Sequence, residues 1–376
     1  MSQILKYLTS QQEAMVSTLA QWVNQDSPTY NKPAVDTMGQ ATAQAFIEAG
    51  ATLSTTHTQK EMGNHYTLSY GNAQSQILTL CHFDTVWPMD EAKKRPFTIE
   101  DNRATGPGIH DMKAGTLIAL FALKAIRHFQ LKPRHKLVYM LTSDEEISSP
   151  TSRLIIEAEG KKSSYCLVPE GSHNKSILTT SRKGVGRFNL EITGKAAHAG
   201  VEPQNGVSAI DELARQIQVL HALNDFERGV TVNVGVVSGG ERPNIVAPFA
   251  TAQADLRVAT QADGDELSRQ ILNLQPQLPG SKINVSGGIT RPPFVETPAG
   301  LALFQKAQDV ARELGFSVER FNSGGGSDGS FVAALGVPTL DGMGSLGGGA
   351  HALHEHILLN SLPLRAALMA ELIMQL

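Results

Sequence analysis

Acidic and histidine side chains directly follow several short apolar segments of this sequence. In chain order they are His82, Asp84, Asp111, Glu145, Glu146, Glu170 and, far downstream, His351. The apolar segments are strand-like, and the carboxyl ends of parallel strands meet at one edge of an open α/β sheet, where such folds bind ligands. Imidazole and carboxylate groups without cysteine suit a hydrolytic metal centre better than a structural zinc site. The sequence therefore predicts metal-dependent hydrolytic chemistry at that edge.

His82 and Asp84 form an H-x-D motif at the end of an apolar run. Side chains two positions apart on a strand point to the same side, so Asp84 can orient the His82 ring from behind. A metal-bound histidine normally donates its second N–H to a carboxylate or carbonyl, which fixes the tautomer. The motif alone equally describes a capped turn, but in the company of the other acidic segments it favours a metal ligand.

Asp111 and the pair Glu145–Glu146 carry the most specific chemistry. Asp111 lies between a glycine-rich turn and an apolar helical stretch, where it could also serve as a helix N-cap. Two adjacent carboxylates at the end of a buried strand repel each other and indicate cations nearby, although an exposed acidic loop is the alternative. Neighbours on a strand end point in different directions, so one glutamate can act as general base and the other as ligand.

Glycines precede the late histidines. Gly342, Gly344 and Gly347 formally match G-x-G-x-x-G, but no helix opens directly after them as a nucleotide-binding fingerprint requires. We expect these glycines to give a tight backbone that delivers His351. His354 competes with His351 for the last ligand position.

The periodicity of the chain predicts two kinds of α/β organisation. Helical and strand-like segments alternate in the first half, with strands at 77–81 and 137–141 and helices at 35–49 and 114–129, which favours parallel strands with crossover helices. From residue 183 the order becomes β-α-β-β-α-β, which is typical of a ferredoxin-like domain. Its strands are expected at 184–193, 230–237, 250–258 and 283–286, and its helices at 206–223 and 263–274.

After Pro298 the alternation of the first half resumes, with a helix at 300–314, a strand at 337–340 and a helix from Leu362. The expected fold is therefore an α/β catalytic domain with a mostly parallel central sheet flanked by helices, interrupted by an inserted α+β domain. We expect the catalytic domain to comprise residues 1–182 and 294–376. The inserted domain then spans 183–293.

Composition limits the class of protein. The chain has 376 residues, more than one hydrophobic core usually accommodates, so two domains are expected. A hydrophobic share of 41% and a charged share of 18% are typical of a globular protein. Thirty-two basic against thirty-six acidic residues leave a net charge of −4, which gives no electrostatic footprint for nucleic acid.

The sequence also predicts location. No stretch approaches the roughly eighteen uninterrupted apolar residues of a membrane span, and the start of the chain lacks the pattern of a secretory signal. Ser10 and Glu13 instead predict a capping box for an amphipathic helix. Cys81 and Cys166 lie inside apolar runs and are expected to be buried free thiols. A cytoplasmic protein is the simplest expectation.

Nine motifs in order along nearly the whole chain resemble the dinuclear-zinc aminoacylase/carboxypeptidase family, and most closely its glutamate carboxypeptidase (carboxypeptidase G) branch. The resemblance implies a zinc-peptidase-like catalytic domain and an inserted lid and dimerisation domain. The motifs are CHFDTV (81–86), GPGIHDMKAG (106–115), SDEE (143–146), VPEGS (168–172), GKAAHAG (194–200), RPNIVAP (242–248), ADLR (254–257), GGGSDGSF (324–331) and GGGAHALHE (347–355).

The resemblance implies a role for each metal ligand. His82 and Glu170 would hold one zinc ion, Glu146 and His351 the other, with Asp111 bridging them. Cobalt or manganese would also fit these donors. The peptide bond after Asp111 is typically cis in the family. The family's downstream glutamate, here Glu355, lies four residues beyond His351 and so favours His351 over His354 as ligand.

The resemblance also implies the catalytic and binding groups. Asp84 would support His82, and Glu145 would be the general acid/base. His198 would help to stabilise the oxyanion, usually from the partner subunit of a homodimer. Asn244 and Arg257 would clamp a substrate carboxylate, and Arg291 would recognise an acidic side chain.

These roles predict hydrolysis of an amide bond to an amino acid with a free α-carboxylate, in a dipeptide or an N-acyl amino acid, with glutamate favoured. Two zinc ions would share a water as bound hydroxide, and Glu145 would take its proton. An N-acyl-amino-acid deacylase of the acetylornithine or succinyl-diaminopimelate type shares the same ligands and remains an alternative. A catalytically inactive binding or regulatory relative should lack the base or a ligand, whereas all six residues are present here.

Overall fold

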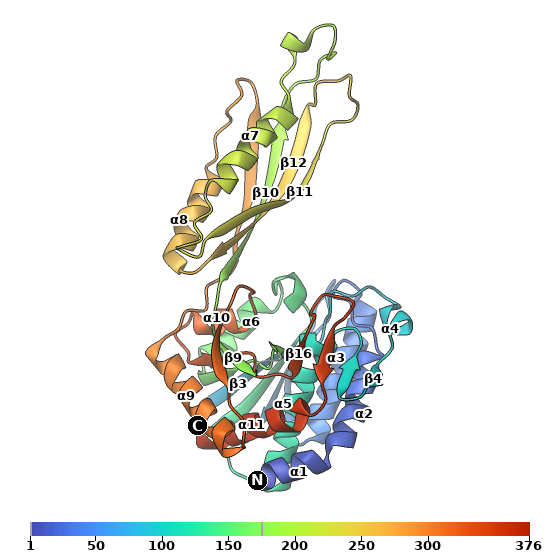
Figure 1. Ribbon diagram of the computed structural model, residues 1–376, viewed down its shortest axis with the longest axis vertical. Coiled ribbons are helices and arrows are strands. Elements are labelled where there is room, and N and C mark those ends of the chain that lie inside the picture. Colours follow the sequence, from blue (N-terminus) through green and yellow to red (C-terminus); the bar gives the residue numbers. More distant parts are fainter. Residues whose placement is uncertain (1, 174–175) are drawn as a thin grey trace. The chain divides into compact units, whose positions relative to one another are not determined.

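The computed structural model describes residues 2–173 and 176–376 (Figure 1). They fall into two units. The larger unit comprises the chain up to Ser181, then Glu296–Asn322 and Ser327–Leu376. The smaller unit comprises Arg182–Val295 together with Ser323–Gly326.

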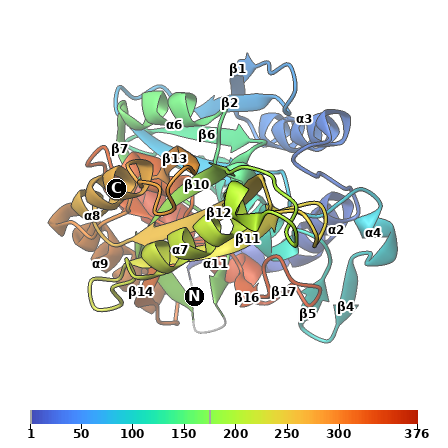
Figure 2. The same cartoon turned by 90° about the horizontal axis from the view of Figure 1, so that it is seen from above.

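A six-stranded sheet forms the centre of the larger unit. Four neighbouring strands, β6, β3, β7 and β15, are parallel, whereas β1 and β2 are antiparallel and β1 forms one edge (Figure 2). Every residue of β3 is buried, which agrees with the largely apolar sequence of this strand. The strands, in spatial order, are β1 (Thr52–His57), β2 (His65–Tyr70), β6 (Lys136–Thr142), β3 (Gln76–His82), β7 (Ser163–Leu167) and β15 (Thr339–Leu340).

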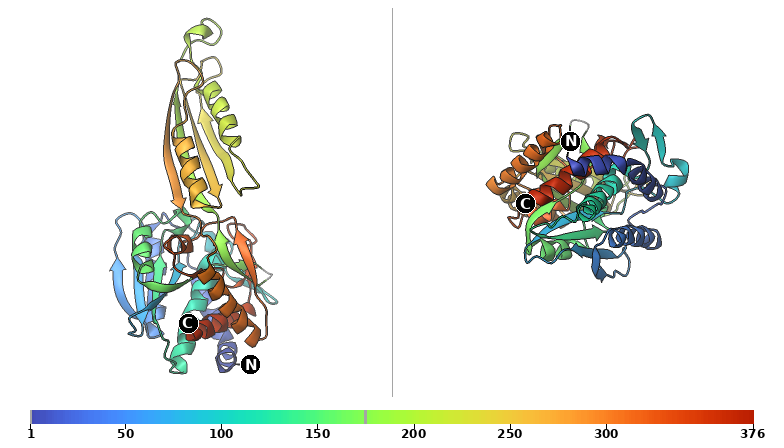
Figure 3. Two further views of the ribbon diagram at one scale, coloured as in Figure 1. Left: turned by 90° about the vertical axis from the view of Figure 1, so that its left-hand side faces the viewer. Right: turned by 90° about the horizontal axis from the view of Figure 1, so that it is seen from below.

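Helices bury both faces of this sheet. Ile77 and Cys81 of β3 belong to the core under α5, α11, α1 and α2, whereas Leu78 and Leu80 belong to the core under α6 and α10. α1 packs on α11, so the first described helix and the last lie at the same end of the unit (Figure 3). The helices of this unit are α1 (Gln3–Ser10), α2 (Gln12–Val23), α3 (Lys32–Glu48), α4 (Glu91–Lys94), α5 (Ala114–His128), α6 (Arg153–Gly160), α9 (Pro298–Glu313), α10 (Gly329–Ala333) and α11 (Ser361–Gln375).

A second, smaller sheet joins segments that are distant in sequence. Its strands, in spatial order, are β4 (Thr98–Glu100), β5 (Arg103–Thr105), β17 (His356–Leu358), β16 (Leu346–Gly348) and β8 (Ser172–His173). Asp111 follows β5, Glu170 precedes β8, and His351 lies between β16 and β17. This sheet, which the sequence did not reveal, therefore holds three candidate ligand segments together. A separate pair consists of β9 (Ile177–Arg182) and β14 (Glu319–Ser323).

The smaller unit has the expected β-α-β-β-α-β order. Its four-stranded sheet has the spatial order β11-β12-β10-β13 and is antiparallel throughout, as in a ferredoxin-like fold. The helices α7 and α8 pack on this sheet over a core of its own. The elements are β10 (Gly184–Thr193), α7 (Ala209–His221), β11 (Thr231–Gly239), β12 (Phe249–Val258), α8 (Gln261–Leu272) and β13 (Lys282–Arg291).

The chain enters and leaves the smaller unit at neighbouring positions. Arg182 donates its backbone N–H to the carbonyl oxygen of Phe294 at 2.9 Å, and Phe294 donates in return at 3.0 Å. The insertion therefore begins and ends side by side.

The start of the chain differs from the expectation. The predicted capping box at Ser10 and Glu13 is not formed. Instead, α1 ends at Ser10, and the Ser10 hydroxyl donates to the carbonyl oxygen of Tyr7. α2 begins at Gln12 without a side-chain cap, and the capping serine is Ser2, which caps α1. The two cysteines are buried free thiols, as predicted. Among the described residues, no helix combines the length and the apolar character needed to cross a membrane.

Candidate metal centre

Asp111 lies between two histidines of the larger unit. Its Oδ1 is 3.0 Å from Nε2 of His82, and its Oδ2 is 3.2 Å from Nε2 of His351. Glu170 Oε1 lies 3.6 Å from the same nitrogen of His82, and Glu146 Oε2 lies 3.1 Å from that of His351. The five residues thus form two histidine–glutamate pairs that share one aspartate. Each pair offers a nitrogen and an oxygen donor, and Asp111 gives one oxygen to each.

The parallel strands bring three of these candidate ligands to one edge. His82 ends β3, Glu146 lies in a 3-10 turn (Glu145–Ile147) just after β6, and Glu170 follows β7. Because these strands are parallel neighbours, their carboxyl ends coincide. Atoms of His82, Asp111 and Glu146 that could bind a metal lie within 4.8 Å of one another. The sequence pattern therefore predicted this meeting correctly.

Asp111 and His351 come from irregular backbone rather than from strand ends. Asp111 lies in the turn Ile109–Lys113 before α5, and its peptide bond to Met112 is cis, as the family resemblance predicts. His351 has a φ of 63°, in the left-handed region. His354 contributes its carbonyl oxygen to a hydrogen bond with the ring of His356 instead. Of the two competing histidines, His351 is the one whose ring lies beside Asp111 and Glu146, at 3.2 and 3.1 Å, and its role as a ligand stays a prediction.

The buried residue Asp84 contacts two parts of the candidate site, the ring of His82 and the turn that carries Glu145 and Glu146. His82 Nδ1 lies 3.1 Å from the backbone oxygen of Asp84 and 3.4 Å from its Oδ1. The same carboxylate accepts the backbone N–H groups of Glu145 and Glu146, both at 3.3 Å, and the hydroxyl of Thr29 at 2.8 Å. Asp84 thus contacts the candidate ligand His82, and its supporting role there stays a prediction. It also anchors the turn that carries both glutamates, which the sequence did not suggest.

Two glycines, Gly115 and Gly344, pack directly against the backbone of Pro169 and Glu170, where no side chain would fit. A Cβ at Gly115, in the first turn of α5, would lie 1.7 Å from the carbonyl oxygen of Pro169. A Cβ at Gly344 would lie 2.6 Å from the carbonyl oxygen of Glu170, which accepts the N–H of Gly344 at 2.8 Å. The glycine loop was expected from the sequence to position His351. The structure shows that it also fixes the backbone of Glu170.

Glu355 is fully buried and accepts four hydrogen bonds. Its Oε1 accepts the backbone N–H groups of His110 at 2.9 Å and Asp111 at 3.1 Å. Its Oε2 accepts the N–H of Gly108 at 2.9 Å and the indole N–H of Trp87 at 3.1 Å. One carboxylate, four residues beyond His351, therefore fixes the turn that presents Asp111. In the sequence, Glu355 stood out only for its spacing from His351.

We expect Glu355→Gln to weaken Zn²⁺ binding by about 10- to 100-fold, the usual effect of losing a residue that orients ligands. Glutamine has the same volume, but its NH₂ group would face N–H donors and displace the Asp111 turn. Competition with a chromophoric chelator measures the affinity. The control is Glu157→Gln, which removes a carboxylate that pairs with Arg153 on α6. Equal affinity in both variants would contradict the role of Glu355.

Neighbouring carboxylates raise the pKa of the two histidines. Burial lowers the pKa of His82, but hydrogen bonds with three carboxylates, Asp111 first, raise it by more, so that it lies well above the ordinary value. Hydrogen bonds with Asp111 and then Glu146 raise the pKa of His351 to about 11. Burial raises the pKa of Asp111, but hydrogen bonds with His351 and His82 outweigh burial and lower it.

The flanking glutamates are shifted upward. Burial, and then the charge of Asp111, raises the pKa of Glu146 to about 8 and that of Glu170 to about 7. Glu145, itself buried, lies near enough to add to both shifts. Acidic groups crowded together in this way require cations, and the oxygen and imidazole donors suit divalent ions. The residues present therefore fit a pair of metal ions.

We expect Zn²⁺ binding to release protons and to strengthen as pH rises from 6 to 8. The ligands bind metal only when deprotonated, and the pKa values of about 7 for Glu170, about 8 for Glu146 and about 11 for His351 mean that protons compete across this range. Affinity should rise about tenfold per pH unit for each proton released. Calorimetry in buffers of different ionisation enthalpy counts the protons. A pH-independent affinity would contradict the prediction.

The remaining candidates lie in the smaller unit. The ring nitrogen Nδ1 of His198 accepts backbone N–H groups from Gly200 at 3.2 Å and Val201 at 3.1 Å, which places the proton of a neutral ring on Nε2. Asn244 accepts the N–H of Ala199 at 3.0 Å, so its loop lies against the His198 loop.

The two candidate arginines, Arg257 and Arg291, differ in surroundings. Arg257 pairs with Asp255 through Nε at 2.7 Å and Nη2 at 3.0 Å. Arg291 ends β13, is buried, and lies next to Gly326. The catalytic and binding roles of these residues stay predictions.

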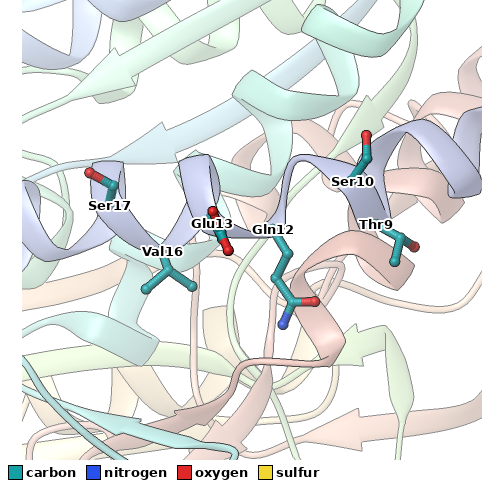
Figure 4. A pocket seen from close by; sticks show the side chains of 6 residues that line it. All are labelled: Thr9, Ser10, Gln12, Glu13, Val16 and Ser17. Atoms are coloured by element: carbon teal, nitrogen blue, oxygen red, sulfur yellow. The ribbon is translucent and has the colours of Figure 1, made fainter.

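A hollow of about 610 Å³ lies elsewhere on the larger unit, along α1 and α2 (Figure 4). It is lined by Thr9, Ser10, Gln12, Glu13, Val16 and Ser17. With a single carboxylate and no histidine among these residues, it does not provide a metal site.

Comparisons with known proteins agree with the geometry. The model of peptidase family M20/M25/M40 matches residues 78–375. Carboxypeptidase G2 of Pseudomonas sp. (strain RS-16) is 30% identical over 381 residues, which cover 98% of this chain and 90% of the relative. A succinyl-diaminopimelate desuccinylase of Verminephrobacter eiseniae (strain EF01-2) is 26% identical over 307 residues, covering 77% of this chain and 76% of the relative.

Solved structures share the fold. An M20 family metallo-carboxypeptidase from Sulfolobus solfataricus superposes with a TM-score of 0.76 at 18% sequence identity. The match covers 96% of this chain and 98% of the other. The α/β catalytic fold with its inserted ferredoxin-like domain is thereby confirmed.

Proposed function

The chain belongs to peptidase family M20/M25/M40 and is a metal-dependent hydrolase of amide bonds, and from that premise we propose which residues carry the reaction and on what substrate. His82 and Glu170 would hold one divalent ion and Glu146 and His351 the second, with Asp111 serving both. Zinc is the proposed metal. The division of the two Asp111 oxygens between His82 and His351 is the observation that carries this assignment.

When bound, the ions supply an activated water and polarise the amide carbonyl. Glu145, which is not one of the ligands, takes the proton of that water and passes it to the departing amine. Its backbone is held by Asp84, so the base is fixed next to the ligands. Burial of Glu145 restricts access of bulk water to the proton that it carries.

The smaller unit supplies groups that recognise the substrate. His198 donates its Nε2 proton to the developing oxyanion, a role that suits the tautomer fixed by Gly200 and Val201. Asn244 and Arg257 bind the α-carboxylate of the amino acid. The planar guanidinium of Arg257 pairs with Asp255 through Nε and Nη2, and a planar fork of this kind suits a carboxylate partner.

The proposed substrate is a dipeptide or N-acyl amino acid with a free α-carboxylate, and Arg291 favours glutamate as the released amino acid. A screen tests this with N-acyl-glutamates, dipeptides ending in glutamate, acetylornithine and succinyl-diaminopimelate. Activity should disappear on chelation and return with two Zn²⁺ per subunit. If the glutamate compounds are inert while acetylornithine or succinyl-diaminopimelate is cleaved, the enzyme is a deacylase of that type instead.

The proposal includes a homodimer in which His198 serves the partner's metal site. The edge strand β11 of the smaller unit exposes Val236 and Val237, each more than half exposed, as an interaction surface would. Mixing inactive His198→Ala and Glu145→Ala subunits should restore part of the activity. Absence of any recovery in mixed dimers would argue against a shared site.

A further inference from the structure

Arg365, on the helix α11, is a charged residue buried in the interior of the larger unit, with only 1% of its surface exposed. Its Nε donates to the carbonyl oxygen of Gly344 at 2.8 Å, and its Nη2 donates to that of Gly342. Nη2 also donates to the carbonyl oxygen of Ile177, where β9 begins, at 3.3 Å. One guanidinium therefore holds backbone oxygens from two separate stretches of the chain.

The charge of Arg365 has no acidic partner in the described chain. Burial alone lowers its pKa to about 9, and no described carboxylate acts against this shift. Its Nη1 is buried and makes no hydrogen bond with a described residue. A buried cation without an ion-pair partner is costly, and an apolar side chain of similar length would fill the same space more cheaply. The backbone carbonyls that it holds are therefore the reason for a guanidinium here.

Two of these carbonyls belong to the segment 342–345, which lies along the segment 168–172 that carries Glu170. Three backbone hydrogen bonds of 2.8 to 3.1 Å join the two segments. They run from Met343 to Val168, from Gly344 to Glu170 and from Ser172 to Ser345. Arg365 thus holds a segment that in turn holds the backbone of Glu170.

The Glu170 segment is enclosed on two sides. The carbonyl oxygen of Pro169 would lie 1.7 Å from a Cβ at Gly115 and 2.4 Å from a Cβ at Gly344, so it lies between these two glycines. Gly115 belongs to the regular helix α5, whereas the segment 342–345 lies outside the helices and strands. The irregular side lacks a helical hydrogen-bond ladder to stiffen it, and the guanidinium of Arg365 supplies a substitute.

We propose that Arg365 is a positioning residue for the metal position formed by His82 and Glu170. By holding the carbonyls of the segment 342–345, it fixes this segment against the Glu170 backbone and so fixes the direction of the Glu170 carboxylate. Arg365 itself touches neither metal nor substrate. The inference rests on the proposed function, in which Glu170 is a ligand.

The metal position formed by Glu146 and His351 should depend far less on Arg365. The turn of Glu146 follows β6 and is held by Asp84. His351 comes after β16, which pairs with β17 and β8 and so separates His351 from the segment 342–345. A positioning role therefore predicts the loss of one metal position, whereas a general loosening of the fold would weaken both.

Zn²⁺ titrations in two backgrounds test the inference. Glu146→Gln removes a ligand of one position and Glu170→Gln a ligand of the other, so each background mainly reports the position that it leaves intact. Arg365→Lys keeps the charge but loses the planar fork that reaches two carbonyls. It should weaken Zn²⁺ binding about 10- to 100-fold in the Glu146→Gln background. In the Glu170→Gln background the change should stay below about threefold.

Arg365→Met, which removes both the donors and the buried charge, should give the same selective loss. Urea unfolding of the metal-free proteins shows which variants fold, and removal of a buried charge makes the methionine variant the safer of the two. The matched control is Arg127→Lys, in the last turn of α5, where the arginine donates to the carbonyl oxygen of Glu48 at 2.8 Å. This control should leave Zn²⁺ affinity unchanged in both backgrounds.

The outcomes separate the inference from the proposed function. If the Arg365 variants weaken Zn²⁺ binding equally in both backgrounds, or in neither, the positioning role is wrong while the proposed function stands. If the unmodified enzyme binds no Zn²⁺, or if Glu146→Gln and Glu170→Gln bind it as the unmodified enzyme does, the proposed ligands are wrong and the role of Arg365 fails with them.

Discussion

Glu145→Gln is expected to lower kcat by about 10²- to 10⁴-fold while both Zn²⁺ ions stay bound. The amide cannot accept the proton of the attacking water, but it keeps the volume and the backbone hydrogen bond to Asp84. Because Glu145 is not one of the proposed ligands, metal content should equal that of the unmodified enzyme. Steady-state kinetics together with elemental analysis of the dialysed protein provides the measurement.

Glu146→Gln is the matched control for this prediction. The two glutamates are adjacent, both donate their backbone N–H to the carboxylate of Asp84, and Glu146 lies 3.1 Å from His351. The control should therefore lose metal as well as activity. If Glu145→Gln keeps its kcat, or loses metal as Glu146→Gln does, Glu145 is not the acid/base and the prediction is wrong.

Asp111→Asn is expected to empty both metal positions at once. Each oxygen of Asp111 faces a different histidine, and asparagine replaces one of the oxygens with an NH₂ donor. We expect fewer than one Zn²⁺ per subunit after dialysis, and kcat reduced on the order of 10³-fold or more. Glu170→Gln, which alters only one pair, should retain more metal than Asp111→Asn in the same titration. Equal loss in the two variants would argue against a bridging aspartate.

Much of the fold follows from local periodicity. β10 has the bounds read from its alternating side chains, and the ferredoxin-like order follows from the succession of strands and helices. β13 extends to Arg291, whereas the predicted strand ends at residue 286. The prediction ends too early because the two glycines that follow Ser286 interrupt the alternation of side chains. Long periodic segments carry a readable signal.

The smaller sheet of β4, β5, β8, β16 and β17 could not be read from the sequence. Its strands have two or three residues, too few for any period to show. They pair only because distant loops come together in the folded chain. That sheet nevertheless helps to position Asp111, Glu170 and His351, and the preference for His351 over His354 came only from the family resemblance.

The candidate site likewise has one part that could be predicted from the sequence and another that could not. The clustering of His82, Glu146 and Glu170 could be inferred from parallel strand ends. The support given by Glu355 and the second contact of Asp84 could not, because a buried carboxylate that accepts backbone N–H groups has no sequence signature of its own. Such contacts depend on which loop lies opposite, and that is decided by tertiary packing.

The hydrogen-bonded pair Arg182 and Phe294 has a consequence for protein engineering and for evolution. Because the excursion of the chain starts and finishes at adjacent residues, a short turn could replace everything between them without moving the flanking strands. The proposed metal ligands all lie outside that excursion. The proposed recognition residues of the inserted unit could therefore be exchanged as one module while the proposed metal ligands stay in place.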